Sequence, residues 1–198
     1  MKKQLLWVWC VLLLVGVAAA EDGSWQQGKT VRAPFAARGM VILHLSAGDA
    51  TIVENPDAKE IVITTETKSA EKLKSIKVSL NAAGSTADIR VDGPDNNFRY
   101  KIELPTAADL KIRMSAGDLN VSGVDGNFDA ELYAGDCNVQ LATAPENFGP
   151  IDLSVKAGDV TAEPFRASKG GLFRHFHDRR IAKYKFHAHV GAGDLNVK

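Results

Sequence analysis

Apolar and polar residues alternate strictly along five stretches of this chain, and each stretch ends at the same tripeptide. In the first stretch the apolar positions are Val41, Leu43 and Leu45, and equivalent positions are apolar in the other four. The tripeptide is Ala-Gly-Asp, at residues 47–49, 116–118, 134–136, 157–159 and 192–194. A period of two is typical of β-strands with one buried face. The pattern therefore predicts a strand–turn–strand unit that is used repeatedly.

Each unit has a glycine and an aspartate at its corner. Glycine adopts a positive φ without steric cost, and a corner between two strands commonly requires one. The neighbouring aspartate can accept hydrogen bonds from backbone N–H groups of the turn. A short apolar pair follows each corner, such as Leu119 and Val121. A single unit cannot bury its apolar face, so we expect the units to stack around a shared core.

These features predict an all-β fold, a β-solenoid of stacked units with Ala-Gly-Asp corners. A two-sheet β-sandwich is the alternative. We expect one domain over residues 41–198, preceded by a lead-in over residues 21–40. The corner glycines are widely spaced after the first and fourth units, which predicts insertions at residues 53–108 and 163–185. The first insertion contains strand-like stretches, some of which are expected to be further coils, and it has room for one helical turn at residues 69–74.

The first twenty residues have the pattern of a secretory signal peptide. Lys2 and Lys3 precede an apolar run over residues 5–17, and three alanines before Glu21 form a cleavage site. The run is shorter than the roughly 20 residues of a membrane span, so we expect cleavage, with retention as an anchor as the alternative. We therefore expect export to the periplasm or cell surface and no stable membrane span after cleavage.

The charge of the chain is balanced, but its basic residues are unevenly placed. Lysine and arginine together equal aspartate and glutamate at 24 each, which gives no global electrostatic case for nucleic-acid binding. Residues 163–185 nevertheless hold seven basic residues against two acidic ones. Such a patch attracts anionic polymers or lipid headgroups; the alternative is a basic hairpin whose aromatic residues cover the open end of the stack. The seven residues are Arg166, Lys169, Arg174, Arg179, Arg180, Lys183 and Lys185.

The corner aspartates form one column of equivalent positions, spaced by about 4.8 Å if the strands pair. Adjacent carboxylates repel, so either backbone donors cap them or a cation such as Ca²⁺ bridges them. Calcium-binding β-rolls have a nine-residue repeat with additional glycines, and this chain has neither feature. A structural role is therefore favoured, and a calcium site is the alternative. The column consists of Asp49, Asp118, Asp136, Asp159 and Asp194.

Two alternating histidine pairs are candidate metal ligands. His175 and His177 lie in the second insertion, and His187 and His189 lie in the last long strand. Each pair can project to one face and offer neutral imidazoles to Zn²⁺. The repeat register places the second pair at outward positions, where histidines are usually solvated. Cys137, in contrast, shares the register of inward apolar residues, so we expect a buried, unreactive thiol.

The signal peptide, the Ala-Gly-Asp-apolar-x-Val corners and the closing Val-Gly-Ala-Gly-Asp-Leu-Asn-Val resemble the bacterial putative-adhesin domain family. The resemblance runs from about Val41 onward. It implies an exported β-solenoid envelope protein of unassigned biochemical role, and it provides no catalytic residues. Envelope polymers, glycans and surface proteins are then the candidate partners.

We therefore expect an adhesin-like binding or scaffolding protein that is not an enzyme and needs no cofactor. A Ca²⁺- or Zn²⁺-dependent structural or binding domain is the alternative. A carbohydrate-active enzyme ranks third, because that chemistry requires two carboxyl groups at a defined separation in a cleft.

Overall fold

The computed structural model describes residues 24–94 and 96–198, so the signal peptide inferred from the sequence lies outside the described residues. The all-β class is confirmed: the described chain contains strands and three 3₁₀ turns, η1 (Ala70–Ser75), η2 (Pro145–Asn147) and η3 (Glu163–Phe165). Within these residues no helix is long and apolar enough to cross a membrane. The strands are β1 (Gln26–Pro34), β2 (Met40–Ala47), β3 (Asp49–Asn55), β4 (Glu60–Thr67), β5 (Lys77–Ala83), β6 (Thr86–Asp92), β7 (Phe98–Pro105), β8 (Asp109–Ala116), β9 (Leu119–Val124), β10 (Phe128–Ala134), β11 (Cys137–Leu141), β12 (Phe148–Ala162), β13 (Ala167–Asp178), β14 (Tyr184–Ala192) and β15 (Leu195–Val197).

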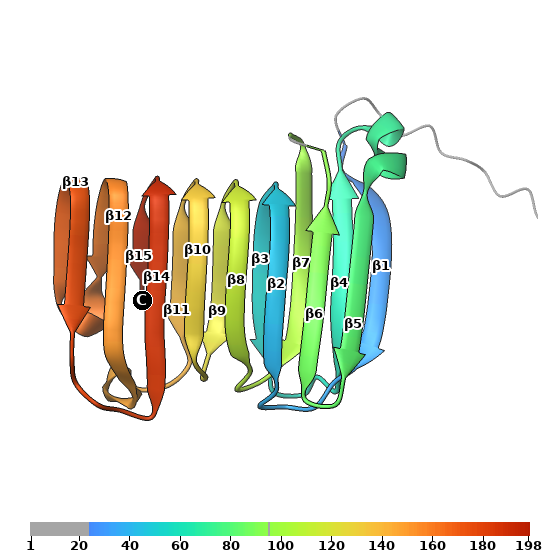
Figure 1. The fold of residues 1–198 in the computed structure, drawn as a ribbon. Helices are drawn as coiled ribbons and strands as arrows, with labels where there is room; N and C mark the ends of the chain where they lie inside the picture. Colours follow the sequence, from blue (N-terminus) through green and yellow to red (C-terminus); the bar gives the residue numbers. More distant parts are fainter. Residues whose placement is uncertain (1–23, 95) are drawn as a thin grey trace, which may run out of the picture.

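The strands join into one hydrogen-bonded sheet that folds over into two layers (Figure 1). One layer has the order β12-β14-β10-β8-β2-β6-β5, and the other has the order β15-β11-β9-β3-β7-β4-β1. Strand β12 belongs to both layers, because it pairs with β14 before Gly158 and with β15 after it. At the opposite end β1 and β5 contact one another, so the sheet nearly closes on itself.

The five corners lie side by side in parallel register. The corner alanines of neighbouring long strands pair with one another, in the order Ala47, Ala116, Ala134, Ala192 and Ala157. This order differs from the order along the chain. Strand β14 of the last unit lies between β10 and β12, so the fifth unit is inserted between the third and the fourth.

Antiparallel strands cover both ends of this stack. In the first insertion, β6 and β7 extend the parallel rows beside β2 and β3, without an Ala-Gly-Asp corner. Strands β4 and β5 run the other way, antiparallel to β7 and β6, and the helical turn η1 joins them. Strand β1, from the lead-in, pairs with β4. At the other end β13 pairs with β12 along its whole length.

The core fills the space between the two layers. Alternate residues of every parallel strand are buried there, as the period-two pattern predicts. Four phenylalanines close the core next to β13: the rings of Phe128 and Phe186 stack at 4.8 Å, and Phe148 and Phe165 meet Phe186 edge-on. The thiol of Cys137 is also buried, and this burial raises its pKa to about 12.

Candidate functional site

Histidines lie among acidic and other polar residues across the outer surface of the layer that contains β14. Strand pairing aligns these outward side chains in two rows, because neighbouring strands are in register. The first row consists of His177, Asp152, His187, Asp129 and Lys111 on β13, β12, β14, β10 and β8. The second row consists of His175, Ser154, His189, Glu131, Arg113 and His44. We call this surface the histidine face.

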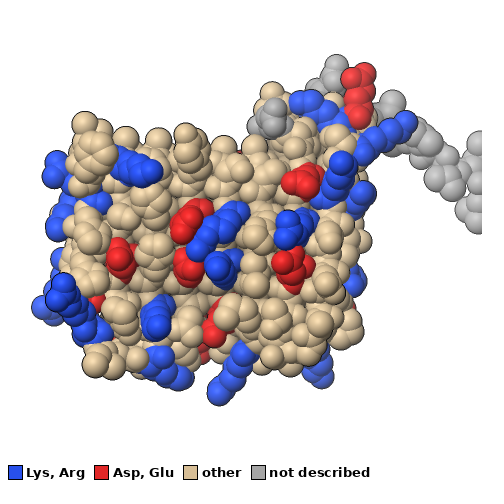
Figure 2. Space-filling model, viewed as in Figure 1, with Lys and Arg blue, Asp and Glu red and all other residues tan. Residues whose placement is uncertain are grey.

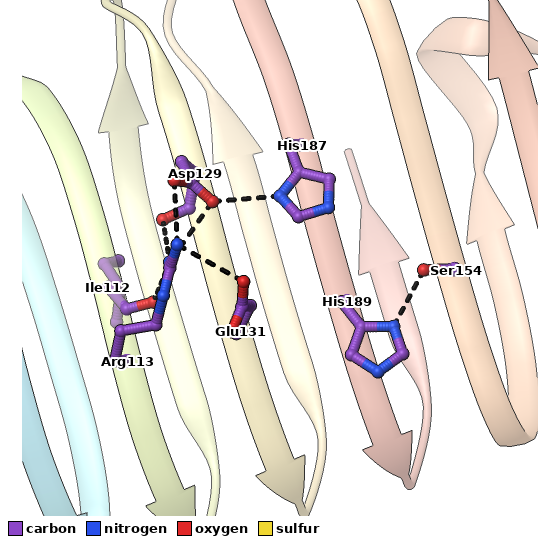
Figure 3. A network of polar contacts seen from close by, with 7 residues as sticks. All are labelled: Ile112, Arg113, Asp129, Glu131, Ser154, His187 and His189. Carbon is purple, nitrogen blue, oxygen red and sulfur yellow. Dashed lines mark hydrogen bonds and ion pairs between the residues drawn. The ribbon is translucent and has the colours of Figure 1, made fainter.

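An arginine connects the two rows in the middle of the histidine face (Figure 3). The Arg113 guanidinium donates to both carboxylate oxygens of Asp129, at 3.2 and 2.9 Å, and lies 3.3 Å from Glu131. His187 Nδ1 lies 2.9 Å from the same Asp129 carboxylate. Partial burial raises the pKa of Asp129, but the contacts with Arg113 and His187 outweigh it and hold the pKa below its ordinary value. Asp129 is therefore an anion shared between two partners.

His189 has a different environment. Its Nδ1 lies 2.8 Å from the hydroxyl oxygen of Ser154, as Figure 3 shows. Partial burial, followed by the charge of Lys156, lowers the pKa of His189, so its neutral form is favoured. His187 and His189 are thus neighbours on one strand that contact different residues.

At the β13 end of the histidine face, two imidazoles converge on one carboxylate. His175 Nε2 lies 2.9 Å from Asp152 Oδ1, and His177 Nδ1 lies 3.9 Å from Asp152 Oδ2. In the described part of the chain these three are the one group of histidine, cysteine and acidic residues whose ligand atoms all lie within 4.8 Å of one another. The two rings are 5.9 Å apart, centre to centre.

The structure thus brings all four candidate histidines to one face but gathers only His175 and His177 around a common acid. The sequence alone did not connect Asp152 with either histidine. The available signal was the strand-like pattern of the two segments that form β12 and β13. In the structure these strands pair antiparallel, with Asp152 opposite His177. Finding that register requires knowing that the second insertion folds back on the fourth unit.

Four of the five corner aspartates in the described chain form a ladder, in which each carboxylate accepts a backbone N–H from the next corner or strand along the stack. The Oδ1 atom of Asp136 accepts the backbone N–H of Asp194 at 2.8 Å, and that of Asp194 accepts the N–H of Asp159 at 2.9 Å. Asp118 and Asp159 accept in the same way from Asp136 and Gly171, at 3.4 and 3.2 Å. This geometry supports the structural role of the column; the calcium alternative stays a prediction.

The seven basic residues of the second insertion are all exposed, and they lie on β13, in the segments that flank it and at the start of β14. Figure 2 shows lysine and arginine side chains gathered over this end of the molecule. Arg180 is partly neutralised, because its guanidinium pairs with Asp178. Lys183 lies over the ring of Tyr184, and Lys169 donates to the backbone oxygen of His175 at 2.8 Å.

The large apolar residues of this insertion fall into two groups. Phe165 is buried, and Phe176 packs against the core at its edge, so both cover the end of the stack. Leu172 and Phe173, in contrast, expose 65% and 78% of their surface. The second insertion is therefore both an end cap and the carrier of the basic patch.

No family model matches this chain, and no curated protein is significantly similar to it. Solved structures are similar. A putative cell adhesion protein from Clostridium sporogenes is 12% identical, with 86% of this chain and 98% of that chain covered, at a TM-score of 0.52. A putative adhesin from Bacteroides fragilis is 8% identical, with 89% and 99% covered, at a TM-score of 0.32. The resemblance inferred from the sequence is confirmed for the fold, which this chain shares with the clostridial protein.

Proposed function

We propose that this protein is an exported, adhesin-like binding or scaffolding protein of the bacterial envelope or cell surface, and that it is not an enzyme. We propose further that its basic end binds an anionic envelope polymer or glycan. The observation that carries the proposal is the set of seven exposed basic side chains around β13, at one end of a chain whose total charge is balanced. The description of the clostridial neighbour as a putative cell adhesion protein supports the same general role.

We infer that the scaffold is a β-solenoid, in which each coil gives one strand to each layer. The parallel register of the five corners and the matching register of the short strands after them support this inference. A stack of this kind is extended and is capped at both ends by antiparallel strands. Such a scaffold can hold a binding end at a fixed position relative to the rest of the molecule.

Electrostatic attraction gives the proposed binding its physical basis. A local excess of like charges concentrates oppositely charged polymers near the surface. Because the side chains involved are exposed, added salt screens the attraction, with a Debye length of about 10 Å at 0.1 M ionic strength. Arg174, Arg179 and Lys185 come from β13, the following loop and β14, so a polymer could contact all three elements.

A polymer pair that differs only in charge tests the proposal. Residues 21–198, which contain every described strand, would be purified and titrated with dextran sulfate and with uncharged dextran. We expect binding to dextran sulfate alone. This binding should weaken steeply as salt is raised from about 50 to about 300 mM, because the Debye length is about 14 Å at the lower concentration and shortens as salt is added. Equal binding to both polymers, or to neither, would contradict the proposal.

Two triple variants locate the binding end. Arg174, Arg179 and Lys185 are changed to glutamine in the first, and Lys29, Lys74 and Lys77 are changed to glutamine in the second. Each variant removes three exposed positive charges, but the second set lies at the β1–β5 end of the sheet. We expect the first variant to lose most binding and the second to keep it. An equal loss in both would show that net charge, and not the β13 end, determines binding.

Export is tested on the full chain. We expect cell fractionation to place the protein outside the cytoplasm and amino-terminal sequencing to begin at Glu21. A cytoplasmic protein that still begins at Met1 would overturn this part of the proposal.

A further inference from the structure

Three side chains converge from two strands at the β13 end of the histidine face. Asp152 lies on β12, and His175 and His177 lie on β13. Each contributes a ligand atom within 4.8 Å of the other two. We propose that Asp152, His175 and His177 form a binding site for a divalent first-row transition-metal ion, with Zn²⁺ as the reference ion.

The spacing of the donor atoms suits a single ion. His175 Nε2 lies 2.9 Å from Asp152 Oδ1, and His177 Nδ1 lies 3.9 Å from the other oxygen, Asp152 Oδ2. Donors bound to one tetrahedral zinc ion lie about 3.3 Å apart, since the individual bonds are roughly 2.0–2.1 Å long. The two observed separations lie on either side of this value. Bringing the donors onto one ion therefore requires these two separations to change by about 0.4 and 0.6 Å.

Strand pairing holds the three residues in position. Strands β12 and β13 pair antiparallel, with Asp152 opposite His177 and Ser154 opposite His175. Side chains two residues apart on a strand point to the same face, so both imidazoles project beside Asp152. Strand β12 also pairs with β14 on its other side, which fixes Asp152 within the sheet. Sites built on paired strands are better preorganised than sites on loops.

The donor set selects the class of metal. Two imidazole nitrogens and one carboxylate oxygen suit zinc and its first-row neighbours, whereas Ca²⁺ and Mg²⁺ prefer oxygen ligands alone. The exposed fractions of the Asp152, His175 and His177 side chains are 42%, 56% and 37%. An ion from solution can therefore enter, and water can complete its coordination. An ordinary ion pair with Asp152 would need only one histidine, whereas both His175 and His177 converge on this carboxylate.

Binding would link the cap to the stack. The ion would join β13, an edge strand, to β12, which belongs to both layers. A ligand that binds only the folded chain raises its stability by mass action. This proposal does not rest on polymer binding by the basic patch, because none of its three residues belongs to that patch.

The experiment is a calorimetric titration of residues 21–198 with Zn²⁺ alone. The protein is purified without a polyhistidine tag and freed of metal with EDTA, which is then removed. We expect one ion per chain. The double variant His175→Ala/His177→Ala should bind at least about tenfold more weakly, as loss of metal-supporting residues commonly does. The matched control His187→Ala/His189→Ala removes two histidines of the same face and should bind as the unchanged protein does.

A second measurement reports the coordination itself. Co²⁺ bound at the site should give visible absorption bands, and Asp152→Asn should shift or weaken them while far-ultraviolet circular dichroism stays unchanged. Absence of Zn²⁺ binding by the unchanged protein would overturn the proposal. So would binding that survives in His175→Ala/His177→Ala, or an equal loss in the two double variants, because either would place the ion elsewhere or on scattered histidines.

Discussion

Gly117 packs against the backbone of Gly48 so closely that a Cβ atom at Gly117 would lie 2.1 Å from the Gly48 carbonyl oxygen. Its φ is +104°, a conformation that residues with a side chain rarely adopt. The same contact recurs along the stacked corners, where a Cβ at Gly135 would lie 2.2 Å from the Gly117 oxygen. The glycine of the repeat is thus required twice, for its φ and for the approach of the next unit.

We therefore expect Gly117→Ala to lower the free energy of unfolding by about 3 kcal/mol or more, as substitutions that strain a packed backbone do. Gly84→Ala is the matched control, since Gly84 also has a positive φ, +60°, but has no atom within 4 Å of the added Cβ. Gly84→Ala should lower the free energy of unfolding by only about 1–2 kcal/mol, because only the backbone conformation is then strained. Urea unfolding of both variants measures the difference. Equal losses would mean that crowding between corners contributes nothing.

The aspartate ladder makes a separate prediction. Asp194→Ala removes the acceptor for the Asp159 N–H, 2.9 Å away, and should destabilise the protein by about 1 kcal/mol. Asp194→Asn keeps an acceptor oxygen and should lose less. Asp49→Ala is the control, because in the described part of the chain no hydrogen bond to the Asp49 carboxylate is found. Thermal unfolding curves in EDTA and in Ca²⁺ should coincide. A rise in the unfolding midpoint that only Ca²⁺ produces, and that Asp194→Asn removes, would favour the calcium alternative.

The repeated corner was predictable because its physical requirement is local. Alternation specifies which residues are buried, and Ala-Gly-Asp specifies where the strand turns, so neither needs knowledge of distant partners. The burial of Cys137 follows from the same register: it pairs with Leu119 on one side and Leu195 on the other. The residues of the repeated units could therefore be assigned to the core or to the surface directly from the sequence.

The order of the units and the convergence of His175 and His177 on Asp152 could not be predicted in this way. The five corners are chemically alike, so the sequence does not say that β14 inserts between β10 and β12. That insertion depends on β13 folding back along β12, which also places His177 opposite Asp152. Both features arise from pairing between segments whose patterns are compatible with several partners.

Cys137 should be unreactive in the folded protein. Burial raises the pKa of its thiol to about 12, and the thiolate is the form that reacts with disulfide reagents. For residues 21–198 we expect no reaction with a disulfide reagent such as Ellman's reagent under native conditions, and one reactive thiol per chain after unfolding in guanidinium chloride. Rapid reaction of the folded protein would show that β11 opens.

Glu54 is an acid buried at the end of β3. The residue is 6% exposed, and its Oε2 accepts the backbone N–H of Ala107 at 2.7 Å. In the described part of the chain its Oε1 is buried without a partner. Burial raises the pKa of Glu54 to about 8; hydrogen bonds from Ala107 and Ala108 oppose the shift, and the charges of Asp125 and Asp109 add to it.

This shift makes stability depend on pH in a defined direction. Between the ordinary pKa of 4.5 and the folded value of about 8, the folded chain holds a proton that the unfolded chain releases. The stability that this bound proton of Glu54 gives to the folded chain is therefore complete below pH 4.5 and is lost as pH rises through about 8. Glu54→Gln stays neutral, so its stability relative to the unchanged protein should grow by a few kcal/mol, roughly, from pH 5 to pH 8.5. Urea unfolding at several pH values measures this; parallel stability curves would mean that Glu54 ionises normally in the folded chain.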